Sequence, residues 1–345
     1  MNILIYSDNH FCQNSSLVRG RGNRFSDRLE NQIQTLHFIE SVAVDNNCKA
    51  IFNCGDFFDR PELNSEEISA LKEIRWNTDI AHYYIVGNHD ASDRALSFNS
   101  TNALASVHNS FIIDKPAVLC IGDSLIALLP YVSLNSDEYI PLEEIFSPSI
   151  TDDRYRNKIL LSHNEVKGLQ YGKYVSDHGL SYKEIDSLFS ICFNGHLHNS
   201  ISIKNKLINI GNITGQNFSE DAFTYKHCCI VLNTNNLEYH FIENPFAFKF
   251  YKIDKDRYGT IPTLGANSVL SVTCDESQLD YVKSLIDSNP NIKYKKITVQ
   301  REMHSDDSRF FEDVKTPENK FSDFVLKTLG DSKIVREELS SVCGV

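Results

Sequence analysis

A short apolar run, Ala50 to Cys54, stops at a glycine and is followed at once by the carboxylate Asp56. A run of this length that ends on glycine is typical of a buried strand. Open α/β sheets carry their ligand-binding residues just beyond the carboxyl ends of their strands. We therefore predict that Asp56 lies at such an edge. A carboxylate there can bridge two metal ions about 3.5–4 Å apart, the spacing used for displacement at phosphorus.

Other apolar runs along the chain also end on residue types that bind metals. They are Ile3–Tyr6 before Asp8 and His10, His82–Val86 before Asn88, His89 and Asp90, Ile159–Leu161 before His163, and Ser190–Phe193 before His196 and His198. A histidine at any one of these places is more often an ordinary core or surface residue. Their shared position at strand ends predicts one site made of oxygen and imidazole ligands, a set that suits manganese, iron or zinc.

The length and charge of the chain limit how it can bind its partners. At 345 residues it exceeds the usual size of one core, so we expect a large domain and a smaller one. A net charge of -12 argues against a global basic field for nucleic acid. The most basic short stretch is a loop rich in Gly, Asn and Ser, and it is either a solvated loop or a phosphate-backbone contact. Its arginines are Arg19, Arg21, Arg24 and Arg28.

The chain shows no sign of a membrane or secreted protein. No apolar run approaches the roughly 20 residues needed to span a bilayer, and the first residues enter a strand without a charged leader. We expect a cytoplasmic protein. The nine cysteines are odd in number and form no Cys-x-x-Cys pair, so reduced core thiols are favoured over disulfides or a thiolate zinc site.

The motifs Asp-x-His, Gly-Asp-x-x-Asp, Gly-Asn-His-Asp, a lone His and Gly-His-x-His occur in that order. Over about residues 1–245 they resemble the calcineurin-like metallophosphoesterases. Within that superfamily the chain most resembles the SbcD-type double-strand-break repair nuclease subunits, which include phage recombination endonuclease subunits. The Phe25-x-Asp27-Arg28-Leu29 helix start and Asp90 carry this closer likeness, whereas Asp59 departs from the His of some members.

The resemblance implies an α/β fold: a four-layer β-sandwich flanked by helices over residues 1–245. It further implies a small α/β domain that caps DNA at 246–300 and a linker with a helical, partner-binding tail at 301–345. The tail carries an apolar stripe that either packs on the chain's own body or contacts a partner, and we favour the partner. The stripe consists of Phe321, Phe324, Val325 and Leu329.

The resemblance also implies how the site residues are used. One metal ion would be held by Asp8, His10, Asp56 and His198, and the other by Asp56, Asn88, His163 and His196. Manganese is the expected ion, with magnesium, iron and zinc as alternatives. His89 would lie over the scissile phosphate and protonate the leaving oxygen, while Asp90 would orient its ring.

The favoured function is a metal-dependent DNA exonuclease and endonuclease for end processing, recombination and repair. By resemblance it would be a homodimer that works with an SbcC-like ABC ATPase carrying a long coiled coil. The alternative is a phosphatase or cyclic-nucleotide phosphodiesterase of the same superfamily. A non-catalytic scaffold on this fold would be expected to have lost metal ligands or the turn histidine, and none is missing here.

Overall fold

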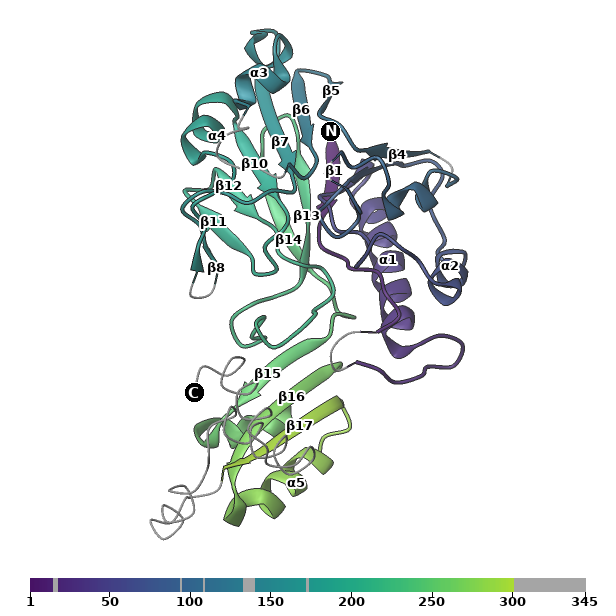
Figure 1. The fold of residues 1–345 in the computed structure, drawn as a ribbon, viewed down its shortest axis with the longest axis vertical. Helices are drawn as coiled ribbons and strands as arrows, with labels where there is room; N and C mark the ends of the chain where they lie inside the picture. Colours follow the sequence, from purple (N-terminus) through teal and green to yellow (C-terminus); the bar gives the residue numbers. More distant parts are fainter. Residues whose placement is uncertain (15–17, 94, 108, 133–139, 172–173, 301–345) are drawn as a thin grey trace, which may run out of the picture. The chain divides into compact units, whose positions relative to one another are not determined.

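The computed structural model describes residues 1–14, 18–93, 95–107, 109–132, 140–171 and 174–300 (Figure 1). The predicted tail helices at 321–329 and 334–342 lie outside the described residues. The chain divides into a unit made of Met1–Cys274 and Asp280–Thr298, and a second made of Asp275–Leu279 and Val299–Val345. The two large sheets and the candidate site lie in the first unit.

The first sheet has six strands in the order β14-β13-β1-β2-β3-β4. Their bounds are β1 Asn2–Tyr6, β2 Cys48–Asn53, β3 Ala81–Ile85, β4 Ser110–Ile113, β13 Cys228–Asn233 and β14 Tyr239–Glu243. The strands from β1 to β4 run parallel, and β13 pairs antiparallel with β1. Figure 1 shows green β13 beside purple β1, which lie far apart in the sequence.

The second sheet also has six strands, in the order β11-β12-β10-β7-β6-β5. Their bounds are β5 Ala117–Ile121, β6 Ser124–Leu129, β7 Asn157–Ser162, β10 Ile191–Asn194, β11 Ile201–Ile203 and β12 Leu207–Asn209. The four strands β6, β7, β10 and β12 are parallel. Because parallel strands end at the same edge, each sheet collects its strand-end loops on one side.

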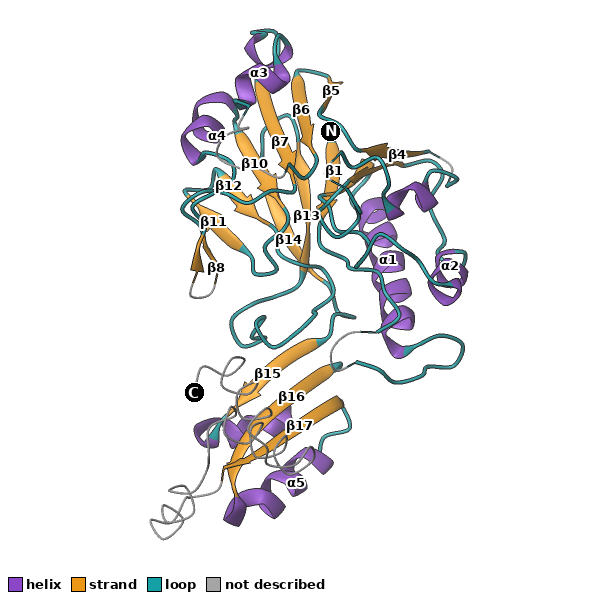
Figure 2. Ribbon diagram, in the orientation of Figure 1, coloured by secondary structure: helices purple, strands orange, loops and turns teal. Residues whose placement is uncertain are grey.

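Three apolar cores arrange the two sheets and their helices in four layers (Figure 2). Along β1, Ile3 and Ile5 face the second sheet while Leu4 and Tyr6 face α1 (Asp27–Asp45). The first core also includes α2 (Ser65–Leu71), and the third core includes α3 (Leu142–Phe146) and α4 (Tyr182–Leu188). The predicted α/β fold is therefore confirmed, since both sheets are covered by helices on their outer faces.

The two helices on the outer face of the first sheet both begin at a side-chain cap. At the start of α1, Ser26 accepts a hydrogen bond from Leu29 N at 3.2 Å. In α2 the cap is Asn64, and the helix ends at Leu71. The Asn64 side chain bonds the amides of the first turn, and the side chain of Glu67 bonds back to the Asn64 amide at 2.9 Å, completing a capping box.

Beyond the sandwich, β15 (Lys249–Ile253), β16 (Ser268–Asp275) and β17 (Ile292–Gln300) form a third sheet. α5 (Leu279–Asp287) lies between the last two strands in the sequence, so this segment has the order strand, helix, strand. A small core joins this sheet to the loop before α1 through Val18, Phe250 and Val269. The remaining elements are β8 Gln170–Tyr171, β9 Tyr174–Val175, η1 Ser100–Leu104, η2 Ser149–Thr151, η3 Lys255–Thr263 and η4 Glu276–Gln278.

None of the helices among the described residues combines the length and the apolar character needed to cross a bilayer. The eight cysteines in that part of the chain are all free thiols, and all but Cys120 are buried. The prediction of reduced core thiols is confirmed for the seven buried cysteines, whereas Cys120 is exposed.

Candidate metal centre

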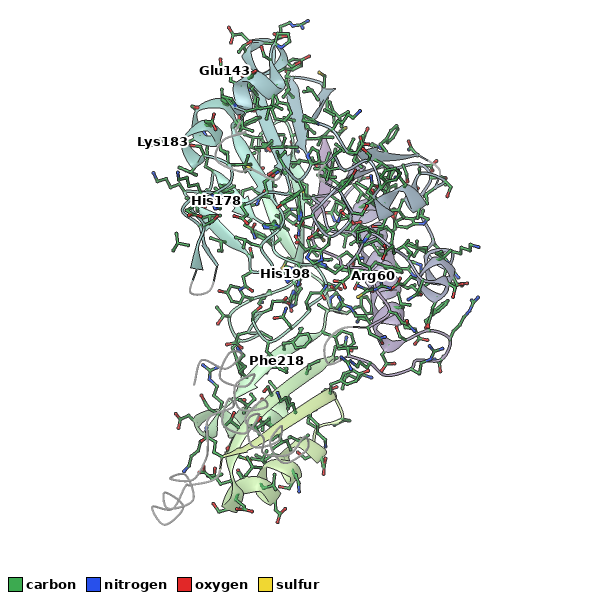
Figure 3. The ribbon with its side chains drawn as sticks, viewed as in Figure 1. Arg60, Glu143, His178, Lys183, His198 and Phe218 are labelled. Carbon is green, nitrogen blue, oxygen red and sulfur yellow. The ribbon has the colours of Figure 1, made fainter. Side chains whose placement is uncertain are left out.

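The structure brings the predicted ligand residues of both sheets to one place. Loops after β1, β2 and β3 carry Asp8, His10, Asp56 and Asn88, and loops after β7 and β10 carry His163, His196 and His198. Side chains from both sheets converge around His198, while the exposed His178 lies apart from it (Figure 3). The two sheets therefore meet at their strand-end edges, as the sequence pattern predicts.

Four of these residues adopt a left-handed backbone. The φ angles are 52° at Asp8, 46° at His10, 50° at Asp56 and 79° at His196. Such conformations cost on the order of 1–3 kcal/mol each in non-glycine residues and cluster at functional sites. On a regular strand the side chains of His196 and His198, two residues apart, would point to the same face. The left-handed backbone at His196 bends the chain between them, and each histidine joins a different ligand group. The loop therefore wraps around the cluster.

One half of the cluster consists of Asp8, His10 and His198. His10 Nε2 lies 3.0 Å from His198 Nε2 and 3.9 Å from Asp8 Oδ1. The other oxygen of Asp8 accepts hydrogen bonds from Ser7 Oγ and from the backbone of His196. Asp8 Oδ1 is left buried without a donor. A buried carboxylate oxygen without a partner is costly, so this half is suited to a cation.

The second half consists of Asp56, Asn88, His163 and His196. His163 Nε2 lies 3.1 Å from Asp56 Oδ2 and 3.2 Å from Asn88 Oδ1. The same Asn88 oxygen lies 2.9 Å from His196 Nδ1. On the far side of its ring, His163 Nδ1 bonds the Cys54 carbonyl at 2.7 Å, which orients Nε2 toward the other ligands.

Asp56 lies between the two halves. Its Oδ1 accepts a hydrogen bond from His89 N at 2.8 Å. Its Oδ2 faces both halves, 3.1 Å from His163 Nε2 and 3.8 Å from His10 Nε2. Burial alone would raise the pKa of this carboxyl, but His163 and His10 outweigh burial and hold the pKa well below its usual range.

The donor set fits a pair of divalent cations. Carboxylate, amide and imidazole atoms converge in two groups with Asp56 between them, and no thiolate takes part. His10 also belongs to a third group of possible ligands, with Asp59 and His89. Without a cation or a proton among them, these acceptor atoms would repel one another in a buried site. Mixed oxygen and nitrogen ligands are typical of manganese, iron and zinc sites.

His89 lies beside this cluster on the solvent side. Its ring is exposed and meets the ring of His10 edge-on at 4.8 Å between centroids. Its Nδ1 lies 3.0 Å from the backbone oxygen of Asp59. The Asp59 side chain lies 3.2 Å from His10 Nδ1, an ion-pair distance without hydrogen-bond geometry. Asp59 therefore supports two histidines, a role that the sequence left open.

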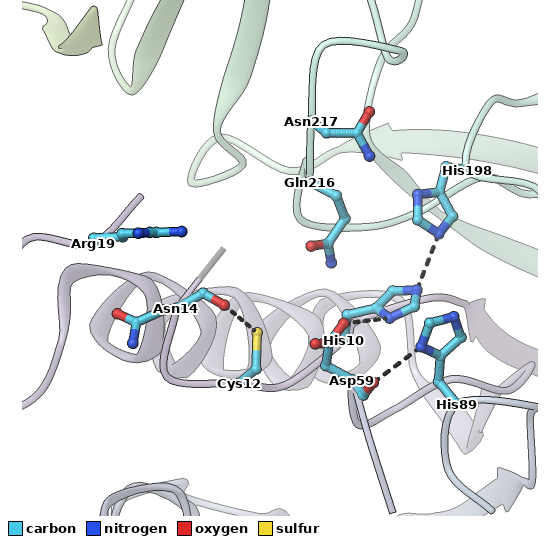
Figure 4. A pocket seen from close by; sticks show the side chains of 9 residues that line it. All are labelled: His10, Cys12, Asn14, Arg19, Asp59, His89, His198, Gln216 and Asn217. Carbon is cyan, nitrogen blue, oxygen red and sulfur yellow. Dashed lines mark hydrogen bonds and ion pairs between the residues drawn. The ribbon is translucent and has the colours of Figure 1, made fainter. Parts of the chain in front are cut away.

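A pocket of about 570 Å³ opens beside the cluster (Figure 4). His10, His89 and His198 are grouped at one end, and Arg19 lies at the other. The lining is polar and includes few apolar side chains. The remaining lining residues are Cys12, Asn14, Asp59, Gln216 and Asn217.

Residues 1–200, more than half of the chain, match the family profile of the calcineurin-like phosphoesterases. The chain belongs to this family. Among curated relatives, the phosphoesterase is 24% identical over 143 residues to Putative phosphoesterase 244L of Invertebrate iridescent virus 6, covering 40% of this chain and 47% of the relative. It thus spans about half the length of the curated relative it matches.

Solved structures of similar proteins were also found. One is described as a novel archaeal phosphodiesterase, with 16% identity, a TM-score of 0.36, and coverage of 71% of this chain and 100% of that one. Another is a dimetal phosphatase from Danio rerio, with 12% identity, a TM-score of 0.44, and coverage of 70% and 98%. The family assignment of this phosphoesterase rests on the sequence match alone.

The role predicted for Asp90 is wrong in this phosphoesterase. Asp90 is fully buried, and its two oxygens accept hydrogen bonds from Phe58 N at 2.8 Å and Gly87 N at 2.9 Å. It holds the turn that carries Asn88 against the loop after β2 and does not contact the His89 ring. Burial, and then the nearby Asp56, raise the pKa of Asp90 to about 7.

The predicted basic patch is also corrected. Arg28 is fully buried, where it donates hydrogen bonds to Gly215 O at 2.8 Å and Thr214 Oγ1 at 2.9 Å, so it cannot contact a surface phosphate. Arg21 and Arg24 are exposed but pair with Glu66 and Glu73. Of these arginines, Arg19 is the one that lines the pocket.

Sequence reasoning missed two residues that hold the ligands in place. Gln32 on α1 donates to the carbonyls of Asn9 and His10 at 2.9 and 2.7 Å. Glu220 accepts a hydrogen bond from His198 Nδ1 at 2.9 Å. Gln32 and Arg28 are polar residues four apart on the buried face of a helix, a signal that could have been noticed. No local pattern marks Glu220.

Proposed function

We propose that this phosphoesterase is a divalent-metal-dependent phosphodiesterase that cleaves DNA, as an exonuclease and an endonuclease. The observation that carries the proposal is the position of Asp56 between two ligand groups that open into a polar pocket. Family membership supports phosphoester hydrolysis as the chemistry. The choice of DNA rests on the closer resemblance to SbcD-type nucleases.

The ligand groups define which residues would hold each ion. Asp8, His10 and His198 would hold one ion, Asn88, His163 and His196 the other, and Asp56 would contact both. When bound, a pair of divalent cations supplies Lewis-acid polarisation of the phosphate and lowers the pKa of an attacking water. Manganese is the ion we expect, because the mixed oxygen and imidazole set suits it.

His89 is the residue placed to act on the leaving group. Its Nδ1 donates to the Asp59 carbonyl, which leaves Nε2 on the pocket side of the ring. As the imidazolium, which carries a proton on Nε2 as well as on Nδ1, it can donate a hydrogen bond to a phosphate oxygen and transfer the Nε2 proton to the departing oxygen. Its backbone amide is bound to Asp56, so the ring is held at a fixed position beside the ligand cluster.

The pocket favours a substrate that extends beyond one phosphate group. Its volume of about 570 Å³ reaches from the histidine cluster to Arg19. Pockets of roughly 300–1,000 Å³ accommodate ligands of nucleotide size. Asn14, Gln216 and Asn217 offer amide groups to a neighbouring sugar or base. A phosphatase acting on small monoesters is the alternative within the family.

The test compares substrates with the manganese-loaded full chain. We expect nicking and shortening of linear duplex DNA, and faster hydrolysis of bis-nitrophenyl phosphate than of nitrophenyl phosphate. The Asp56→Asn variant is the matched control for contaminating nucleases. Hydrolysis of the monoester with intact DNA would overturn the proposal in favour of a phosphatase.

We also propose that the chain works as a homodimer with an SbcC-like ATPase, and that residues 246–300 cap the DNA. An acidic subunit with a net charge of -12 needs a partner to supply most phosphate contacts. Co-purification with a coiled-coil ATPase, lost on deleting residues 317–345, is the expected result. Retention of the ATPase by the shortened chain would place its binding surface elsewhere.

A further inference from the structure

Glu220 is a fully buried carboxylate next to the ligand cluster. Its Oε1 accepts a hydrogen bond from His198 Nδ1 at 2.9 Å, and its Oε2 accepts one from the backbone amide of Gln216 at 2.7 Å. Within the described part of the chain, no lysine or arginine forms an ion pair with it. Burying an ionised carboxylate is expensive unless its partners compensate. The His198 ring and the Gln216 amide are therefore the donors that offset the cost of burying this carboxylate.

The bond to His198 determines which ring nitrogen carries the proton. With the proton on Nδ1 and shared with Glu220, Nε2 keeps its lone pair. That nitrogen points at the cluster, 3.0 Å from His10 Nε2 (Figure 4). A carboxylate behind a ligating histidine fixes both its ring orientation and its tautomer.

The bond to Gln216 connects the same carboxylate to the pocket wall. Gln216 and Asn217 line the pocket on the side of His198. The buried side chain of Arg28 also anchors the loop that carries them, because it donates a hydrogen bond to Gly215 O at 2.8 Å. Glu220 thus contacts a metal-ligand candidate with one oxygen and the substrate pocket's backbone with the other.

We propose that Glu220 is a positioning residue that holds His198 ready for a metal ion and holds the Gln216–Asn217 wall ready for substrate. The proposal rests on the proposed function, because it assigns a cation to the His198 group. It goes beyond that function by coupling metal binding to the shape of the pocket through one side chain.

Only a carboxylate of this length satisfies the geometry. Both partners of Glu220 are donors, and a glutamine offers one acceptor oxygen, so Glu220→Gln leaves one donor facing an NH₂ group. Glu220→Asp keeps the charge but is one methylene shorter, so it cannot reach both partners. Each variant separates one requirement, charge or reach, from the other.

The test is calorimetric titration of the full-length apoprotein with Mn²⁺. We expect one of the two manganese affinities to fall about 10–100-fold in Glu220→Gln, as for other residues behind metal ligands, and the affinity of Glu220→Asp to lie between those of Glu220→Gln and the wild type. Glu40→Gln is the matched control, because Glu40 is also a buried glutamate but, among the described residues, contacts Asn77 and His82 and no candidate metal ligand. Its manganese affinity should equal that of the wild type.

A second readout does not depend on any variant folding. Nitrogen chemical shifts of the metal-free wild type should show His198 as the Nδ1–H tautomer or as the imidazolium bonded to Glu220. An Nε2–H tautomer would overturn the proposal. At saturating manganese, Glu220→Asp should also show a raised KM for DNA, because the shorter carboxylate cannot hold His198 and the Gln216 amide together.

The outcomes separate this inference from the proposed function. A wild type that binds no manganese would remove the proposed function. A wild type that binds manganese and cleaves DNA, with unchanged affinity in Glu220→Gln, would overturn the role of Glu220 alone. Melting temperatures measured in EDTA show whether a variant's lost affinity reflects a damaged fold, in which case the tautomer measurement decides.

Discussion

The two six-stranded sheets contribute different chemistry to the same site. The first sheet supplies all the candidate oxygen ligands, Asp8, Asp56 and Asn88, with His10 as its one candidate imidazole. The second sheet supplies candidate imidazoles alone, from His163, His196 and His198. Neither sheet holds the complete candidate set. The candidate metal centre is therefore a property of the packing between the sheets and of neither sheet by itself.

The sheets can meet this closely because glycine stands at their junction. A Cβ on Gly195 would collide with Ser7 Oγ and with the Cys54 carbonyl of the first sheet. A Cβ on Gly55, whose φ is +91°, would collide with the His163 ring of the second. These glycines let strand-end backbones from the two sheets come within ligand-sharing distance.

The largest effect is expected where the two sheets share a ligand. Asp56→Asn removes the charge whose Oδ2 faces both His10 and His163, so we expect loss of both ions and a rate at background. Metal content by mass spectrometry and DNA cleavage measure this. By contrast, His198→Ala, on the second sheet alone, should retain one ion. An Asp56→Asn protein with two ions and normal turnover would contradict the shared centre.

The next largest effect is expected for His89, which lies in the loop after β3 of the first sheet and is not assigned to either ion. His89→Ala should lower turnover by about 10²–10⁴-fold, the usual loss for a general acid, with its metal content unchanged. His178→Ala is the matched control, since His178 is exposed and lies apart from the cluster (Figure 3). Loss of metal together with turnover would show that His89 helps to hold an ion.

The junction itself can be tested by adding one methyl group. Gly195→Ala should lower the free energy of unfolding by about 1–3 kcal/mol, the usual cost of overpacking, because the new Cβ meets backbone and side-chain atoms of the first sheet. Gly265→Ala is the control, since nothing lies within 4 Å of its Cβ. Urea denaturation of the metal-free proteins measures the difference. Equal stability of the two variants would mean that the sheets are not in close contact there.

The smallest effect on the candidate metal centre is expected from the outer side of the first sheet, away from the ligands. Burial raises the pKa of Glu40 on α1 from 4.5 to about 7. The folded protein therefore binds a proton that the unfolded chain has released, and stability falls as pH rises from about 4.5 to 7. His82, 3.6 Å away, has its pKa lowered by burial to about 4, so its own contribution rises with pH up to about 6.5 and partly cancels this fall.

Glu40→Gln removes the first of these two contributions. We expect the variant to gain about 2–3 kcal/mol of stability relative to the wild type between pH 5 and pH 8, since the pKa shift from 4.5 to about 7 falls mostly in this range and one pKa unit corresponds to about 1.4 kcal/mol. Urea denaturation at the two pH values measures the change. Metal binding should stay as in the wild type, and a stability difference that does not vary with pH would contradict the assigned pKa.

Part of this molecule is determined locally by its sequence. Apolar strands, the glycines at their ends and the polar residues that follow are all short-range features of the sequence. The apolar runs therefore predicted that Asp8, Asp56, Asn88 and His163 lie just beyond the ends of strands. The Phe25-x-Asp27-Arg28-Leu29 pattern likewise indicated a helix start, and α1 begins at Asp27. For these elements, residues close together in the sequence determine the local structure.

What the sequence could not show depends on contacts between distant segments. Arg28 reads as a surface cation in a basic loop, yet packing places it under Gly215, and Asp90 reads as the partner of His89, yet it bonds the amides of Phe58 and Gly87. Glu220 carries no local signal at all. Whether a long polar side chain is exposed, buried or bonded to a ligand is decided by the stacking of the two sheets, because burial and hydrogen bonding depend on atoms that only the tertiary structure brings together.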